Sequence, residues 1–230
     1  MDTGLYEGVR RMEKKERRQL GMGKWEPVYW AAAMIPFAIS LVFYQKLPEQ
    51  VPTQWGWEGQ VRGYSGRFMA CFGIPAFMLV MELLIAAAFR LDPKWKNIRR
   101  SGVLGQLSRW FLVVLGILVQ AVITAAGLGQ PVDVSRIVSM FIGFAILVMG
   151  NYLPRCRYNF TMGIRTPWTL NDEKNWNKTH RIAGFFWTAG GILMVVLGYF
   201  RMAVLYFAVL AVIVLVPVGY SYVLYRRESV

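Results

Sequence analysis

The chain has 230 residues, of which 56% are hydrophobic, and it carries a net charge of +13. Its mean hydropathy is +0.37, and soluble domains are usually only roughly 45–50% apolar. This composition excludes an ordinary soluble enzyme or binding domain and predicts an integral membrane protein.

Six apolar stretches each approach the roughly 20 residues that a helix needs to cross the hydrocarbon core of a bilayer. They are residues 27–44, 68–89, 110–128, 137–153, 182–200 and 203–225. We therefore predict an all-α integral membrane protein with six transmembrane helices. So many spans in a chain of this length leave little room for a separate soluble domain.

The basic residues are divided unequally between the two ends of these predicted helices. With the N-terminus placed in the cytoplasm, 21 of the 26 lysines and arginines fall on the cytoplasmic side and five on the outer side. Cytoplasmic connections carry such an excess, so both termini are predicted to be cytoplasmic. Because topology accounts for the positive charge, direct nucleic-acid binding is not predicted.

Residues 1–24 form a predicted cytoplasmic basic tail, whose charges of both signs argue against a cleaved signal peptide. A two-span module over residues 25–109 follows, with residues 45–67 as the larger outer loop. Prolines and glycines exclude a helix in that loop, and the stretches 51–57 and 61–64 predict a short hairpin. Residues 110–230 are predicted to form a second module of four spans.

Glu82 is the one acidic residue inside an apolar stretch. A charged side chain in the membrane costs roughly 2.5–3.5 kcal/mol, so Glu82 has either a structural or a functional role. As a structural group it would join helices by a hydrogen bond to Gln120 or Thr124. As a functional group it would bind a ligand or a proton.

Residues 151–181 lie between the fourth and fifth apolar stretches and contain six basic residues. Pro154 cannot continue a helix and ends the fourth span. Thr169 or Asn171 is predicted to cap a new helix that runs into the fifth span. Residues 153–181 are therefore predicted to form an ordered inner segment.

Two kinds of chemistry are compatible with this segment. Asp172 and His180 share a helix face, which would orient the imidazole for acid–base catalysis. No nucleophile accompanies them, so a structural histidine is the preferred interpretation and no catalytic residue is predicted. The basic side chains would either converge on a phosphate or carboxylate or contact lipid headgroups. They are Arg155, Arg157, Arg165, Lys174, Lys178 and Arg181.

Neither a metal site nor a cofactor is predicted. His180 is the single histidine, so no histidine cluster exists for a metal. Cys71 and Cys156 lie at opposite ends of the predicted spans, where they cannot form a disulfide.

The stretch GNYLPRCRYNFTMGIRTPWTLNDEKNWNKTHRIAGFFW, residues 150–187, resembles the signature of the SdpI-type family of bacterial membrane proteins. Members typically read close to G-N-Y-x-P, then N-x-x-x-G-I-R-T-P-W-T-L, then W-x-x-T-H-R before an apolar span. A second stretch, LPEQVPTQWGWEGQVRGYSGR at residues 47–67, is similar to a module of unknown function that often precedes this signature. Gln54 and Arg62 stand there where a His and an Asp are common.

The resemblance implies a multispan protein of the bacterial plasma membrane. Named members confer immunity against a secreted toxic peptide of the producing cell, and they can hold a transcriptional repressor at the membrane. We therefore expect a non-enzymatic immunity or signal-transduction protein, whose partners are the lipid bilayer, a secreted peptide and a cytoplasmic repressor.

Two sets of site residues accompany this expectation. Peptide contact is assigned to the outer loop, at Trp55, Trp57, Glu58 and Tyr64. Partner or anion binding is assigned to the inner segment, at Asn151, Arg155, Asn159, Arg165, Thr166, Trp168, Trp176, His180 and Arg181. The alternatives are a small-molecule or lipid transporter or channel that uses Glu82, and a membrane enzyme that acts on an anionic lipid or phosphate.

Overall fold

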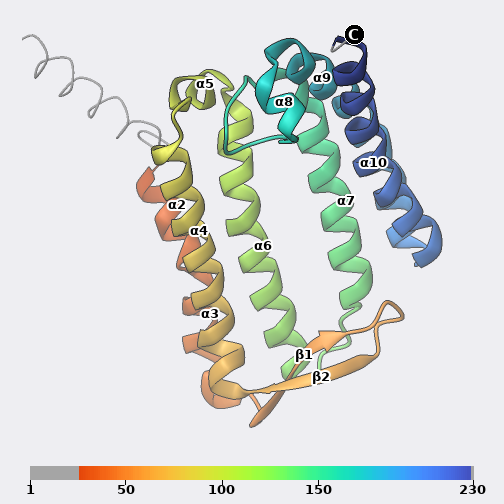
Figure 1. Ribbon diagram of the computed structural model, residues 1–230. Helices are drawn as coiled ribbons and strands as arrows, with labels where there is room; N and C mark the ends of the chain where they lie inside the picture. Colours follow the sequence, from red (N-terminus) through yellow and green to blue (C-terminus); the bar gives the residue numbers. More distant parts are fainter. Residues whose placement is uncertain (1–25, 229–230) are drawn as a thin grey trace, which may run out of the picture.

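The computed structural model describes residues 26–228, and six of its helical segments are long and apolar enough to cross a membrane. The predicted fold class is confirmed: the chain is a multi-pass membrane protein whose spans are helical and mainly α-helical (Figure 1). The predicted tail of residues 1–24 lies outside the described residues. Which end of the helices faces the cytoplasm stays a prediction.

The first three spans pack together as one half of the molecule. Their elements are α2 (Glu26–Ala33), α3 (Ile35–Phe43) and a 3-10 turn (Tyr44–Lys46) in the first span, a π-helical turn (Met69–Gly73) and α4 (Ile74–Leu91) in the second, and α6 (Val103–Gly127) in the third. A short helix, α5 (Trp95–Arg100), lies between the second and third spans. Tyr29 and Val113 belong to one buried cluster of this half, and Cys71 and Ile123 to another.

The apolar pattern predicted that the third span begins at residue 110, but the helix begins at Val103. Arg109 falls in the added part, where its charge interrupts the apolar run. The structure accommodates this charge because the guanidinium lies 3.2 Å from a carboxylate oxygen of Glu26 and 4.1 Å from the ring centroid of Tyr29. A buried charge that is paired in this way can lie within a helix.

The last three spans form the other half. Their elements are α7 (Val134–Tyr152) with a 3-10 turn (Leu153–Arg155), a short helix α8 (Pro167–Asn171), α9 (Glu173–Tyr199) and α10 (Ala203–Glu228). α7 and α9 approach so closely that a Cβ on Gly150 would lie 2.6 Å from the Thr188 nitrogen, and one on Gly191 would clash with the Leu147 nitrogen. Small residues permit this contact between the two backbones.

The predicted hairpin is also confirmed. β1 (Gln50–Trp55) pairs antiparallel with β2 (Val61–Gly66), and Val51 lies opposite Ser65. The hairpin extends across the ends of α6 and α7, below the helices in Figure 1. We call this the hairpin end of the molecule.

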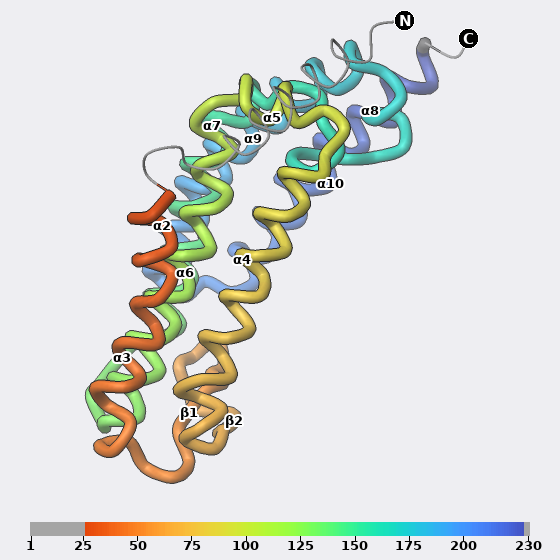
Figure 2. The backbone as a smooth tube through the Cα atoms, turned by 90° about the vertical axis from the view of Figure 1, so that its left-hand side faces the viewer, coloured from red at the N-terminus to blue at the C-terminus, as the bar shows by residue number. Residues whose placement is uncertain are grey.

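Residues 156–172 lie at the opposite end, together with α5 and the last turns of α10 (Figure 2). We call these residues the signature segment and this end the signature end. Between the two ends the halves meet along α6 and α7, where the rings of Phe111 and Phe141 stack with centroids 5.6 Å apart. The predicted module boundary between residues 109 and 110 stays a prediction, although α6 packs with α3 and α4.

Candidate functional site

Asn159 organises the first part of the signature segment. Its side chain is fully buried, and its Oδ1 accepts hydrogen bonds from the backbone N–H groups of Thr161 (2.9 Å) and Met162 (2.6 Å). Its amide nitrogen donates to the Arg157 carbonyl at 2.7 Å. Short polar side chains stabilise turns through such local bonds. The hydrogen bonds of Asn159 therefore explain why this segment is ordered, as predicted.

His180 holds the same segment against α9. Its Nε2 accepts a hydrogen bond from the Ile164 N–H at 3.0 Å, so its Nδ1 is the nitrogen that donates to the Trp176 carbonyl at 2.8 Å. The imidazole also stacks on the Trp176 ring, with centroids 4.0 Å apart. The ring is fully buried, and both of its nitrogens are hydrogen-bonded to backbone groups. These contacts are those of a structural histidine, the interpretation preferred from the sequence.

The pairing of Asp172 with His180 is wrong. Asp172 instead caps α9, where its two carboxylate oxygens accept the backbone N–H groups of Lys174 and Asn175, both at 2.9 Å. The predicted caps at Thr169 and Asn171 are also wrong. The chain breaks into two helices at Asp172, and Thr166 is the cap of the first of them, α8.

Thr169 is buried within α8, where its hydroxyl bonds backbone groups of the preceding residues instead of capping a helix. Its hydroxyl accepts the Thr166 N–H at 2.9 Å and bonds the Ile164 carbonyl at 2.9 Å. Trp168 then reaches α10, where its indole N–H donates to the Ser221 hydroxyl at 2.6 Å. Trp176 lies fully buried on α9 and donates to the Cys156 carbonyl at 2.8 Å. Trp168 and Trp176 therefore connect the segment to α10 and α9 of its own half.

Asp92, which the sequence analysis missed, ties the segment to the other half. This carboxylate follows α4 and is 3% exposed. Its Oδ2 accepts the Phe160 N–H at 2.9 Å and the Thr161 hydroxyl at 2.6 Å, and its Oδ1 accepts the Lys94 N–H at 2.6 Å. The Asp-Pro pair after an apolar stretch signals a turn, but nothing local identifies its partner in the signature segment.

Four of the residues predicted for partner or anion binding, three of them charged, lie on the surface. Asn151, Arg155, Arg165 and Arg181 are exposed. The Arg165 guanidinium donates to the Phe160 carbonyl at 2.8 Å, and the Arg155 guanidinium lies 5.6 Å from the centroid of the Tyr152 ring. Convergence of the basic side chains on one anion stays a prediction. Within residues 26–228, no three His, Cys, Asp or Glu side chains gather where they could hold a metal ion.

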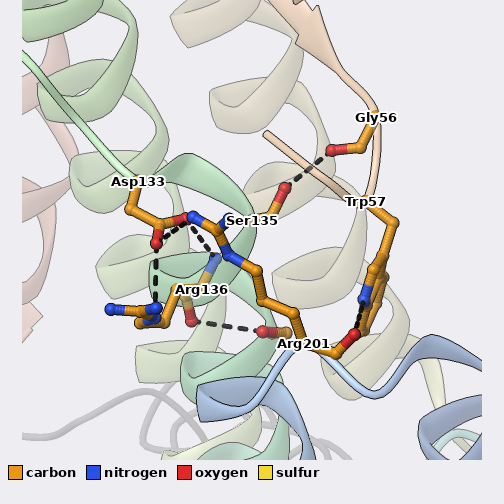
Figure 3. Close-up of polar contacts among 7 residues, drawn as sticks. Gly56, Trp57, Asp133, Ser135, Arg136 and Arg201 are labelled. Carbon is orange, nitrogen blue, oxygen red and sulfur yellow. Dashed lines mark hydrogen bonds and ion pairs between the residues drawn. The ribbon is translucent and has the colours of Figure 1, made fainter. Parts of the chain in front are cut away.

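At the hairpin end, the four predicted residues divide between two environments. Glu58 and Tyr64 are exposed, whereas Trp55 and Trp57 are partly buried. The Trp57 ring packs on Tyr206, with centroids 4.9 Å apart, and its N–H donates to the Arg201 carbonyl at 2.9 Å. The hairpin of one half is thereby attached to the connection between α9 and α10 of the other (Figure 3).

One further hydrogen bond links the hairpin to the other half, and an ion-pair cluster lies beside it (Figure 3). The Ser135 hydroxyl donates to the Gly56 carbonyl at 2.7 Å, which links the hairpin to the start of α7. Asp133 pairs with Arg136 at 3.2 Å and with Arg201. Burial alone would raise the pKa of Asp133, but hydrogen bonds from Arg201 and the Arg136 N–H, together with the two positive charges, hold it below its ordinary value.

A cavity of about 410 Å³ lies beneath the hairpin, between α6, α7 and α10. Its lining residues come from the hairpin (Thr53, Trp55, Gly56, Trp57), α6 (Val119, Val122, Ile123), α7 with its first turn (Val134, Ser135, Val138, Ser139, Ile142) and α10 (Tyr206, Phe207, Leu210). This volume is in the range of small-ligand sites, roughly 300–1,000 Å³. Trp55 and Trp57 therefore face an apolar cavity, which no local pattern in the chain predicts.

Glu82 lies apart from both ends, and its predicted partner is wrong. It is 2% exposed and accepts a hydrogen bond from the Tyr29 hydroxyl, so it joins α4 to α2. Gln120 instead donates to Thr124 along its own helix, at 3.5 Å. The structural partner of Glu82 is thus Tyr29 of the first span. A ligand or proton role for Glu82 stays a prediction.

Comparison with known proteins places both ends of the molecule in recognised families. A model described as the SdpI/YfhL protein family matches residues 155–221, and a model described as a domain of unknown function (DUF1648) matches residues 31–79. The immunity protein SdpI of Bacillus subtilis (strain 168) is 30% identical over 166 residues, which are 72% of this chain and 77% of that protein. No solved structure matches the chain. This identity and coverage show that the chain, with its six candidate spans, belongs to the SdpI/YfhL family of multi-pass membrane proteins.

Proposed function

We propose that this chain is an immunity protein of the bacterial plasma membrane, which protects its cell against a secreted toxic peptide. The similarity to an immunity protein over 72% of the chain carries this proposal. In this account the hairpin end faces the outside and meets the peptide through Trp55, Trp57, Glu58 and Tyr64. No chemical step is required, because protection by binding needs only a surface that captures the peptide.

The geometry of the hairpin supports this role. Glu58 and the 61% exposed Tyr64 are available to a partner at the surface, while Trp55 and Trp57 border the cavity. Aromatic side chains offer a large apolar area with little loss of conformational entropy, so they often dominate binding to peptides.

The signature end would serve a second partner on the cytoplasmic side, a transcriptional repressor that the protein holds at the membrane. Its exposed cations Arg155, Arg165 and Arg181 lie in or beside the signature segment, which is fixed by buried hydrogen bonds of Asn159 and His180. A rigid base with charged side chains suits recognition of an acidic protein surface. The transporter interpretation through Glu82 and the anion-directed enzyme remain alternatives without a supporting contact among the described residues.

A challenge assay tests the proposed function. The full chain is expressed in a bacterium that is killed by the secreted peptide fraction of Bacillus subtilis strain 168, the source of the matched immunity protein. We expect the wild-type chain to raise the tolerated peptide concentration, and Tyr64→Ala with Glu58→Ala to lower that tolerance about tenfold, equivalent to roughly 1.4 kcal/mol of lost binding.

Glu173→Ala is the matched control, because Glu173 is an exposed carboxylate at the signature end. It should leave protection unchanged. A wild-type chain that gives no protection at normal membrane levels would contradict the proposal.

A further inference from the structure

We infer that the cavity beneath the hairpin is the site that receives apolar side chains of the toxic peptide, an inference that rests on the proposed function. It lies where the hairpin of the first half covers the junction of α6, α7 and α10. The peptide would insert these side chains past the hairpin tip, between Trp57 and the start of α7. The exposed hairpin residues would then contact the remainder of the peptide.

The lining of the cavity selects an apolar group. None of its lining side chains is charged, and the aromatic rings of Trp55, Trp57 and Phe207 border it. Its hydroxyl groups are already engaged within the protein: Ser139 donates to the Arg136 carbonyl at 3.2 Å, and Tyr206 donates to the Ser139 carbonyl at 3.1 Å. Water in a cavity needs several polar partners, so this cavity favours a ligand that brings carbon atoms and no buried polar group.

The rim of the cavity favours a peptide over a phospholipid. Asp133 lies beside it and pairs with both Arg136 and Arg201, so each of these guanidiniums already has a carboxylate partner. On the hairpin, Glu58 and Arg62 add exposed charges of opposite sign. An anionic phosphate would be recognised by free cations, whereas an apolar centre with a polar rim of both signs is the usual arrangement of a protein–peptide interface.

The hairpin tip is attached in a manner that permits entry. The Trp57–Arg201 and Ser135–Gly56 hydrogen bonds connect the tip to the other half, and both lie at the edge of the cavity. Few bonds have to break for the tip to move, and Trp57 can repack on an incoming side chain. The peptide would thus replace contacts that the hairpin makes with Tyr206 and Phe207.

Filling the cavity tests the inference. Val138 lines it, whereas its neighbour Ile137 is 36% exposed and does not line it, so Val138→Phe and Ile137→Phe form a matched pair on α7. The variants are challenged with the peptide fraction of Bacillus subtilis strain 168 at equal membrane levels. We expect Ile137→Phe to protect as the wild type does, and Val138→Phe to lose protection at least about tenfold. Equal protection by both variants would overturn the inference while leaving the proposed function intact; absence of protection by the wild type would remove the function itself.

Photocrosslinking provides a second test, which does not depend on whether Val138→Phe accumulates in the membrane. Phe207→p-benzoylphenylalanine places a photoreactive group at the cavity wall of the full chain in cells. After exposure to the same peptide fraction and illumination, mass spectrometry of the purified chain should find a peptide adduct. Adducts with phospholipid alone, or no intermolecular adduct in cells that the chain protects, would overturn it.

Discussion

Gly163 and His180 illustrate how single residues fix the signature segment. Gly163 has a φ of +95°, in the left-handed region that favours glycine. A Cβ at this position would clash with Nε2 of His180, the atom that accepts the Ile164 N–H. The glycine is therefore required twice, by the backbone conformation and by the close approach of the imidazole.

Gly163→Ala should loosen the segment. The left-handed backbone costs an alanine on the order of 1–2 kcal/mol, and loss of the bond to His180 adds about 1 kcal/mol. The measurement is reaction of Cys156 with N-ethylmaleimide at pH 8, located by mass spectrometry. In the wild type Cys156 is 2% exposed, and burial raises its pKa to about 12 despite the hydrogen bond from Asn159, so we expect no reaction.

In Gly163→Ala we expect Cys156 to react, because exposure returns its pKa toward the ordinary value and admits the reagent. Gly129→Ala is the control: Gly129 has a φ of +76°, and a Cβ added there would meet no atom within 4 Å, so this variant carries the backbone cost without the steric contact. A Cys156 that stays as protected in Gly163→Ala as in Gly129→Ala would show that the contact with His180 is unimportant.

The local sequence did not determine which residue caps each helix here. Thr166, Thr169, Asn171 and Asp172 can each cap a helix, and local preference does not rank them. The structure resolves the choice through contacts with α9: His180 accepts the Ile164 N–H, which fixes the residue whose carbonyl Thr169 bonds. The imidazole of His180 bonds the Ile164 N–H and the Trp176 carbonyl, so it is not oriented by Asp172 as the catalytic alternative required.

At the scale of elements, apolar length predicted all six spans because crossing a bilayer places a strict lower limit on a helix. The start of α6 was predicted too late, since the pairing of Arg109 with Glu26 involves residues far apart in the chain. The hairpin could be predicted from its prolines and glycines, which act locally. Its position over α7 and α10 could not, because that depends on Trp57 meeting Arg201 and Tyr206.

Asp92 provides a test of the contact between α4 and the signature segment. In Asp92→Asn one carboxylate oxygen becomes an amide donor, which then faces a backbone N–H or the Thr161 hydroxyl. We expect a loss of about 2 kcal/mol, typical of hydrogen bonds to a charged group. For a chain of this size that corresponds to roughly 4–8 °C in the thermal unfolding temperature of the purified protein.

Glu173→Gln serves as the comparison for Asp92→Asn, because Glu173 is exposed in the first turn of α9. Its unfolding temperature should remain within about 1 °C of the wild type, since exposed substitutions usually have small effects. If Asp92→Asn unfolds at the same temperature as Glu173→Gln, the bonds to Phe160 and Thr161 do not hold the two halves together.

At the scale of the whole molecule, two halves of three spans are joined at both ends. The hairpin of the first half is bonded to the second through Trp57, and the signature segment of the second half is bonded to the first through Asp92. The cavity lies at the hairpin attachment, along the junction of α6, α7 and α10. No sequence pattern predicts such a cavity, because it arises from helices that do not fill the space between them.

The division of roles between the two ends depends on their orientation in the membrane. Tyr64→Cys and Arg165→Cys place one exposed thiol at each end, and the native Cys71 and Cys156 are buried. Intact cells that express either full-length variant are treated with a membrane-impermeant maleimide, then lysed and treated again. We predict labelling of Tyr64→Cys in intact cells and of Arg165→Cys only after lysis. The reverse pattern would place the hairpin in the cytoplasm and contradict its role as the surface that meets a secreted peptide.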